Sequence, residues 1–118
     1  MGRFVKVAED GDVRPGKAKA VRLADRKVAL FNENGAILAY EDYCTHTGGP
    51  LTQGSCADGV VTCLWHGAQF RIADGAPLTP PAGGRLRGYP VRVVDGAIGA
   101  RLLGTIKRYI EYPPAMLL

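Results

Sequence analysis

Short apolar runs recur along the chain, and polar or turn-forming residues separate them. Runs of this length, bounded by turn residues and rich in Val, Ile, Leu and aromatic residues, are typical of β-strands. No internal repeat and no long amphipathic helix interrupts the pattern. We therefore predict an all-β chain, with strands within residues 4–8, 18–24, 27–31, 35–41, 59–63, 68–72, 89–94 and 97–103.

Four dipeptides in which Asn or Asp precedes Gly mark the predicted turns. Asn and Asp tolerate the positive φ angles of a tight turn and glycine favours them, so each dipeptide is expected to close a hairpin. Neighbouring strands should therefore be mostly antiparallel. The dipeptides are Asn34-Gly35, Asp58-Gly59, Asp74-Gly75 and Asp95-Gly96.

The C-terminal segment carries a different pattern. Helix-like spacing is confined to Ile106, Tyr109 and Ile110, and the prolines at 113–114 would end such a helix. The last three residues, 116–118, are apolar, and we expect them to pack back on the sheets or to form a subunit contact.

Two separated pairs of cysteine and histidine carry the strongest chemical signal. Cys44 and His46 occur in the string CTHTGGPL, and Cys63 and His66 occur in CLWHGAQF. Glycine follows each pair and lets a tight loop fold over a ligand. A zinc finger usually supplies a Cys pair and then a His pair, whereas each pair here mixes the two types. The spacing therefore predicts a metal site that is unlike a zinc finger, although zinc stays an alternative.

These motifs and their flanking residues resemble the Rieske family. A Rieske 2Fe-2S centre holds one iron by two thiolates and the other by two imidazoles. The resemblance thus implies that Cys44, His46, Cys63 and His66 ligate such a cluster. Backbone N–H groups of the glycines at 48–49 and 67 are expected to donate to the cluster sulfurs.

The resemblance also implies a fold. It is an antiparallel β-sandwich base with a small inserted cluster-binding subdomain that carries two ligand loops. We expect one Rieske domain over residues 1–118, with the cluster-binding subdomain at about residues 43–82. A loop that contains Pro80 and Pro81 is expected to cover the cluster as a stiff lid.

High-potential members of the Rieske family carry three features that this chain lacks. These are a disulfide joining the two ligand loops, a serine hydroxyl bonded to a bridging sulfur, and a tyrosine hydroxyl bonded to a cysteine sulfur. The corresponding residues here are Gly49 with Trp65, Ala68 and Phe70. The resemblance therefore implies a potential toward the low end of the Rieske range, roughly −150 mV rather than +300 mV. Trp65 is expected either to pack against the proline loop or to serve as a docking aromatic.

The third cysteine, Cys56, has no thiol partner left once the cluster takes the other two. This odd count argues against a disulfide framework and for a reducing compartment, and we expect Cys56 to be structural rather than redox-sensing. The start of the chain has no apolar leader, and no stretch approaches the length of a membrane span. The sequence thus predicts a cytoplasmic protein with no membrane association.

The formal net charge of +4 is unevenly distributed. Residues 28–70 contain no Lys or Arg, and the remainder carries fifteen basic and seven acidic residues. These basic residues form no run and no helix-turn-helix or RNA-binding signature, which argues against nucleic-acid binding. The acidic residues within 28–70 are Glu33, Glu41, Asp42 and Asp58, which give this stretch a charge of −4.

The acidic stretch contains the predicted cluster. Because Glu41 and Asp42 are negatively charged, we expect redox partners to approach the cluster with a neutral or basic surface. Arg85 and Arg87 would offset these acids if they fold close to the ligand loops.

Oxygenase chemistry in the Rieske family requires a second, mononuclear iron held by two further histidines and a carboxylate. This chain has only two histidines and no GxGxxG dinucleotide motif. We therefore expect an electron-transfer protein rather than an enzyme. Its predicted role is that of a Rieske-type ferredoxin carrying electrons from an NAD(P)H-dependent flavoprotein reductase to a terminal oxygenase. The alternative is a small subunit fixed in a larger oxidoreductase, similar to the Rieske-like small subunit of assimilatory nitrite reductase.

Overall fold

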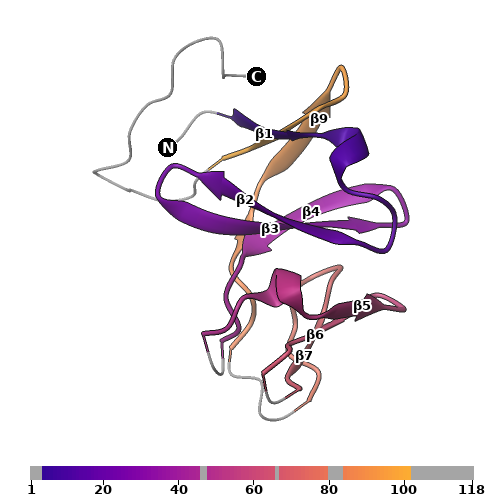
Figure 1. Ribbon diagram of the computed structural model, residues 1–118, viewed down its shortest axis with the longest axis vertical. Coiled ribbons are helices and arrows are strands. Elements are labelled where there is room, and N and C mark those ends of the chain that lie inside the picture. Colours follow the sequence, from indigo (N-terminus) through magenta and orange to yellow (C-terminus); the bar gives the residue numbers. More distant parts are fainter. Residues whose placement is uncertain (1–3, 46–47, 66, 80–83, 102–118) are drawn as a thin grey trace.

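The computed structural model describes residues 4–45, 48–65, 67–79 and 84–101. Within these ranges the chain forms three antiparallel sheets, stacked one above another along the longest axis of the molecule (Figure 1). The prediction of an all-β chain with antiparallel neighbours is confirmed. No helix in the described ranges is long and apolar enough to cross a membrane.

The three sheets contain all of the strands in the described ranges. The outer sheet has the order β1 (Val5–Glu9), β10 (Ala97–Ala100) and β9 (Val91–Val94). The middle sheet has the order β2 (Ala18–Leu23), β3 (Arg26–Glu33), β4 (Ala36–Glu41) and β8 (Gly88–Tyr89). The third sheet has the order β5 (Ser55–Ala57), β6 (Val60–Thr62) and β7 (Gln69–Arg71). Two single-turn 3-10 helices, η1 (Asp10–Asp12) and η2 (Leu51–Gln53), complete the described structure.

Three of the four predicted turns close hairpins. They join β3 to β4, β5 to β6, and β9 to β10, with both turn residues at positive φ in each case. The fourth turn, at Asp74-Gly75, also reverses the chain, but it forms only an isolated antiparallel bridge between Phe70 and Pro77 rather than a hairpin of two strands. A further hairpin turn, between β2 and β3, places Ala24 at φ 57° without any glycine to signal it.

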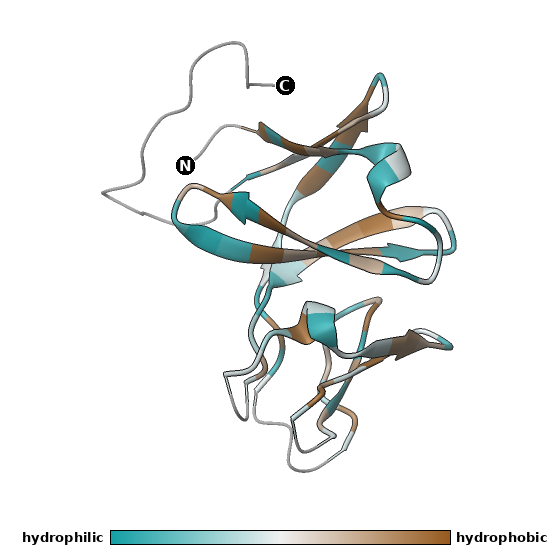
Figure 2. Ribbon diagram, viewed as in Figure 1, coloured by the Kyte–Doolittle hydropathy of each residue, from teal (hydrophilic) through white to brown (hydrophobic). Residues whose placement is uncertain are grey.

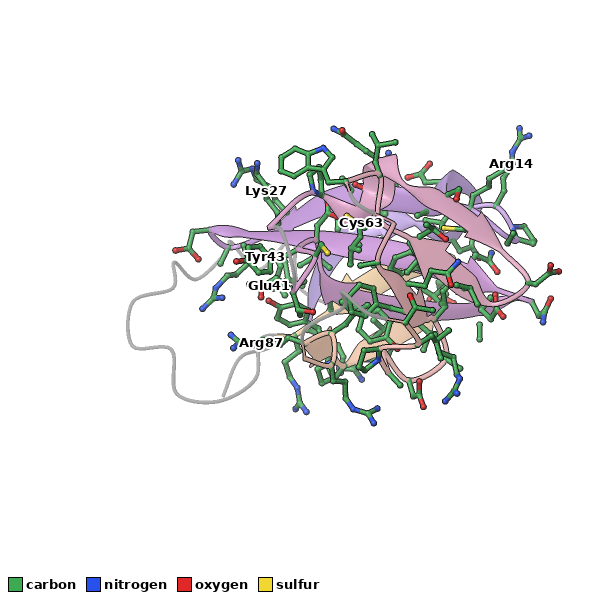
Figure 3. The ribbon with its side chains drawn as sticks, turned by 90° about the horizontal axis from the view of Figure 1, so that it is seen from below. Arg14, Lys27, Glu41, Tyr43, Cys63 and Arg87 are labelled. Atoms are coloured by element: carbon green, nitrogen blue, oxygen red, sulfur yellow. The ribbon has the colours of Figure 1, made fainter. Side chains whose placement is uncertain are left out.

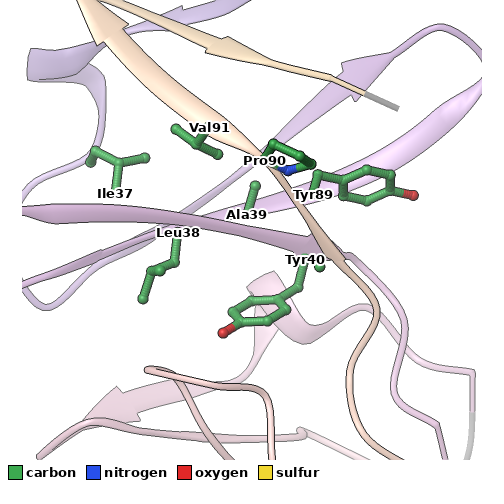
Figure 4. Close-up of a pocket in the computed structure, with 8 residues that line it drawn as sticks. Ile37, Leu38, Ala39, Tyr40, Tyr89, Pro90 and Val91 are labelled. Atoms are coloured by element: carbon green, nitrogen blue, oxygen red, sulfur yellow. The ribbon is translucent and has the colours of Figure 1, made fainter. Parts of the chain in front are cut away.

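The predicted strand at 89–94 divides in two. Pro90 has no N–H to donate, so the ladder of the middle sheet ends at Tyr89, and the chain crosses to the outer sheet. The crossing leaves an open hollow of about 420 Å³ between β4 and the β8–β9 junction (Figure 4). Its lining is mainly aliphatic and aromatic, from residues 37–40 and 88–91, and holds no carboxylate, amine or thiol.

The middle sheet is buried on both faces because β3 alternates between two cores. Val28 and Leu30 belong to the core shared with the outer sheet, whereas Ala29 and Phe31 belong to the core shared with the third sheet. Hydrophobic residues accordingly occupy much of the strands, and hydrophilic residues gather at the turns (Figure 2). Both predicted cysteine ligands, Cys44 and Cys63, belong to the second core.

Tyr40, in β4, joins the middle sheet to the third sheet. Its hydroxyl donates a hydrogen bond to the carbonyl oxygen of Ile72 at 2.5 Å, and its ring meets Phe31 edge-on with ring centroids 6.0 Å apart. A Cβ atom at Gly75 would lie 2.9 Å from the Tyr40 ring, so glycine permits this close approach. Burial, and next Asp74, raise the pKa of Tyr40, while Arg85 opposes this shift. The phenol therefore stays a neutral donor at physiological pH.

We predict that Tyr40→Phe lowers the free energy of unfolding by about 1 kcal/mol, because the buried carbonyl of Ile72 loses its donor. Denaturant unfolding measures the difference, and Tyr43→Phe, at a half-exposed tyrosine, is the matched control. Because the folded-state pKa is raised, this contribution is complete below the pKa of an unfolded tyrosine, about 10. It is lost as pH rises through the folded-state pKa. Equal stability of the Tyr40→Phe variant and the wild type would show that this bond does not join the sheets.

Candidate metal centre

Cys44 begins the first predicted ligand loop, three residues after the end of β4. Its backbone N–H donates to the carbonyl oxygen of Gly49 at 2.8 Å, and its own carbonyl accepts from the N–H of Gly48 at 2.7 Å. The side chain of Cys44 is fully buried in the second core. The sheet and these bonds together fix where the thiol sits.

Cys63 begins the second loop, directly after β6. Its backbone N–H donates to the carbonyl oxygen of Ala68 at 2.7 Å, and its side chain is also buried in the second core. Each cysteine thus opens a six-residue loop that the same kind of backbone bond closes, from residue i to residue i+5. The two predicted ligand loops are built alike and converge on one core.

His46 and His66 lie outside the described residues. In the sequence, each falls between the cysteine and the residue that accepts its backbone bond. The described structure therefore brings together one half of the predicted donor set, Cys44 and Cys63, and closes the loops that contain the other half. Pro80, Pro81 and the C-terminal segment from residue 102 also lie outside the described residues.

Two aromatic side chains pack on glycines of the first loop. A Cβ atom at Gly48, whose φ is +79°, would lie 3.2 Å from the ring of Tyr43, and one at Gly49 would lie 2.9 Å from the ring of Trp65. Trp65 belongs to the second loop, so its indole joins the two loops by contact at the positions where high-potential relatives are expected to carry a disulfide. The indole remains half exposed, which leaves one side of it available for docking.

The backbone N–H of Gly48 is used differently from the sequence prediction. It donates to the carbonyl oxygen of Cys44, so the prediction that it donates to a cluster sulfur is not supported. Gly67 adopts φ +73° in the second loop, a left-handed conformation that favours glycine. Glycine thus permits the turn just before Ala68, and donation from the Gly67 N–H to a cluster sulfur stays a prediction.

The positions expected to tune the potential are apolar and fully buried. Ala68 and Phe70 have no solvent exposure and lie in the same core as Cys44 and Cys63. Neither side chain carries a hydroxyl. The structure therefore places both positions in the core that holds the two cysteines, and the low potential expected from the sequence stays a prediction.

The acidic residues before Cys44 are not exposed docking charges. Glu41 accepts a hydrogen bond from the guanidinium of Arg26 at 3.1 Å. Asp42 is buried, and its carboxylate accepts from both the N–H and the hydroxyl of Thr52, at 2.9 and 2.7 Å. Asp42 therefore ties the entry of the first loop to η2 after its exit, a role that the sequence analysis missed.

Cys56, in β5, is partly buried and forms no disulfide among the described residues. Burial, and next Glu33, raise the pKa of its thiol, while Lys17 lowers it less. A raised pKa disfavours the reactive thiolate. This agrees with the prediction that Cys56 is structural.

Cys44 and Cys63 fit a cluster that needs two thiolates from two loops. Comparison with known proteins agrees: residues 3–90 match the family model of the Rieske [2Fe-2S] domain. The chain is 37% identical over 91 residues to the biphenyl dioxygenase ferredoxin subunit of Pseudomonas sp. (strain KKS102), covering 76% of this chain and 84% of that relative.

Solved structures give the same result. Sphingomonas yanoikuyae B1 ferredoxin has a TM-score of 0.79 at 27% identity, with 85% of this chain and 99% of that chain covered. A chain in the complex of reduced oxygenase and oxidised ferredoxin of carbazole 1,9a-dioxygenase has a TM-score of 0.77 at 28% identity, with 83% and 92% covered.

The Rieske fold and the Rieske-type 2Fe-2S cofactor predicted from the sequence are therefore confirmed. The relatives that match this chain over most of their own length are ferredoxin components of dioxygenases, which supports an electron carrier rather than a catalytic enzyme. The two buried cysteine loops, the three-sheet fold and the match over residues 3–90 all agree: the chain belongs to the Rieske [2Fe-2S] domain family.

Proposed function

We propose that this protein carries single electrons from an NAD(P)H-dependent flavoprotein reductase to a terminal oxygenase. When bound, the 2Fe-2S cluster supplies one-electron redox chemistry. In this proposal Cys44 and Cys63 hold one iron as thiolates, and His46 and His66 hold the other through imidazole. Residues 1–118 form a single Rieske domain, and about residues 43–82 form its cluster-binding part.

The observation that carries the proposal is the pairing of the two loops. Each buried cysteine opens a loop closed by an i to i+5 backbone bond, and each loop contains one histidine of the sequence motif. Relatives named as dioxygenase ferredoxin subunits support the choice of an oxygenase as electron acceptor. The solved complex of a ferredoxin with its oxygenase in carbazole 1,9a-dioxygenase supports it further.

The protein's own residues keep the loops in place. Tyr40 fixes the third sheet against the middle sheet, and Asp42 closes the first loop through Thr52. Trp65 holds the two loops in contact through Gly49. A cytoplasmic location is also part of the proposal.

A size measurement separates this proposal from the alternative of a fixed subunit. A diffusing ferredoxin from native cells should elute from a size-exclusion column at the mass of a small protein. Elution of the whole pool with a large oxidoreductase would favour the subunit role.

The protein should contain two iron and two acid-labile sulfide per chain, because its four donors match one Rieske centre. His46→Ala, His66→Ala, Cys44→Ser and Cys63→Ser should each lose the cluster, whereas Cys56→Ser should retain it as the matched cysteine control. Metal analysis measures the iron in each protein, and visible absorption shows whether the cluster is lost or retained. One zinc per chain without iron would contradict the proposal.

Asp42→Ala should destabilise the first ligand loop, because Thr52 would lose its partner for both a backbone and a side-chain donor. We expect the free energy of unfolding to fall by about 1–3 kcal/mol, and cluster loss during heating to accelerate. Glu41→Ala is the matched control: it removes the adjacent acid, whose partly exposed pair with Arg26 should contribute at most about 1 kcal/mol. Equal cluster loss in the two variants would refute this role of Asp42.

Ala68→Ser with Phe70→Tyr should raise the midpoint potential. Each new hydroxyl that reaches a sulfur stabilises the reduced state, and about 1 kcal/mol of such stabilisation corresponds to about 40 mV for one electron. Val61→Thr adds a hydroxyl to the same core, on the strand position paired with Phe70, and should leave the potential close to that of the wild type. Redox titration monitored by visible spectroscopy measures the midpoint potential of each variant and of the wild type. An unchanged potential in the double variant would mean that these positions do not tune it.

A further inference from the structure

Two exposed cations flank the segment that enters the first ligand loop. The N–H of Glu41 donates to the carbonyl oxygen of Arg87 at 2.8 Å, and the N–H of Asp42 donates to that of Lys27 at 3.0 Å. Figure 3, which views the molecule from the end that carries the third sheet, shows Lys27 and Arg87 on opposite sides of Tyr43 and Glu41. Both cationic side chains are exposed.

Nearby acids are occupied by other partners. Glu41 pairs with Arg26 at 3.1 Å, and Asp74 pairs with Arg71 at 3.0 Å and approaches Arg85 at 3.9 Å. Asp42 is buried on Thr52. Within the described part of the chain, neither Lys27 nor Arg87 forms an ion pair. The exposed charge beside the first loop is therefore positive, although the stretch 28–70 is acidic in sequence.

Three large apolar side chains lie exposed on the ligand loops and just before them. Tyr43 is 50% exposed, Leu64 64% and Trp65 49%. Tyr43 rests on Gly48 and Trp65 rests on Gly49, so both rings are already held in place before any partner arrives. Ordered aromatic side chains with a charged rim are typical of the centre of a protein interface.

We propose that Lys27, Tyr43, Leu64, Trp65 and Arg87 form a cationic docking face that binds an acidic surface of the terminal oxygenase. The inference rests on the electron-carrier function proposed above and specifies its partner. The apolar side chains would meet apolar or aromatic groups of the oxygenase, and the two cations would attract carboxylates around them. This reverses the sequence expectation, in which Glu41 and Asp42 called for a neutral or basic partner.

The sign of the face can be measured with redox probes of opposite charge. The dithionite-reduced protein is mixed anaerobically in a stopped-flow instrument with trianionic ferricyanide or with tricationic hexaammineruthenium(III). At low ionic strength, Lys27→Glu and Arg87→Glu should each slow oxidation by ferricyanide about five- to tenfold, and added salt should remove the effect. Both variants should accelerate oxidation by hexaammineruthenium(III).

Arg14→Glu is the matched control. Arg14 is exposed and lies at the right edge of Figure 3, away from Lys27 and Arg87, and its reversal changes the net charge by the same amount. It should alter either rate less than about twofold. If Lys27→Glu and Arg87→Glu behave as Arg14→Glu does, the docking face is wrong and the carrier function stands. If the reduced protein reacts with neither probe, the carrier function itself fails.

The apolar part is tested with an acidic redox protein, oxidised cytochrome b5, as the probe. Leu64→Ser should slow electron transfer to cytochrome b5 severalfold while leaving the ferricyanide rate unchanged, because only a protein surface needs the apolar contact. Val93→Ser, at an exposed valine of β9, is the matched control and should change neither rate. Equal cytochrome b5 rates for Leu64→Ser and the wild type would remove the apolar side chains from the docking face.

Discussion

Strand β3 is buried on both of its faces, and the rest of the molecule depends on this constraint. Val28 and Leu30 face one core, and Ala29 and Phe31 face the other. Because side chains alternate along a strand, a shift of one residue in register would exchange the two cores. Pairing with both β2 and β4 along the length of β3 fixes that register. The middle sheet can then support the outer sheet on one face and the third sheet on the other.

The metal centre follows from the second of these cores. The thiols of Cys44 and Cys63 are packed with Phe31, Phe70 and other apolar side chains, so they sit in a site of low polarity. Buried thiolates need a positive partner, which a bound iron provides. In the sequence, His46 and His66 follow the cysteines and so lie further than they do from the ends of β4 and β6. The same architecture therefore buries the cysteine end of the centre and leaves the loops to meet a partner.

The sequence predicted most of the strands and the type of cofactor, because apolar runs, Asn-Gly and Asp-Gly turns and Cys-His spacing are local signals. It missed the turn at Ala24, where a non-glycine residue adopts positive φ. It also missed β5, whose residues Ser55–Ala57 form no apolar run. Contacts between distant residues could not be read from a local pattern. Examples are the hydrogen bond that Thr52 donates to Asp42, the packing of Trp65 on Gly49, and the hydrogen bond that Tyr40 donates to Ile72.

The exposed charge beside the first ligand loop could not be predicted from the residues that precede Cys44 in the sequence. Glu41 and Asp42 precede Cys44 in the chain, but one is paired and the other is buried. Lys27 and Arg87 are distant in sequence from that cysteine and from each other, yet backbone bonds place both beside the segment that leads to it. Solvent-facing charge is set by which side chains the fold leaves exposed and without an opposite charge.

We propose that a single centre joins two thiolates and two imidazoles from the paired loops. Pulsed EPR of the reduced protein, prepared with 15N-labelled histidine, tests this most directly. We expect hyperfine couplings from two histidine nitrogens bound to the same paramagnetic cluster. A reduced cluster with no histidine nitrogen coupling, or with coupling from one histidine alone, would contradict it.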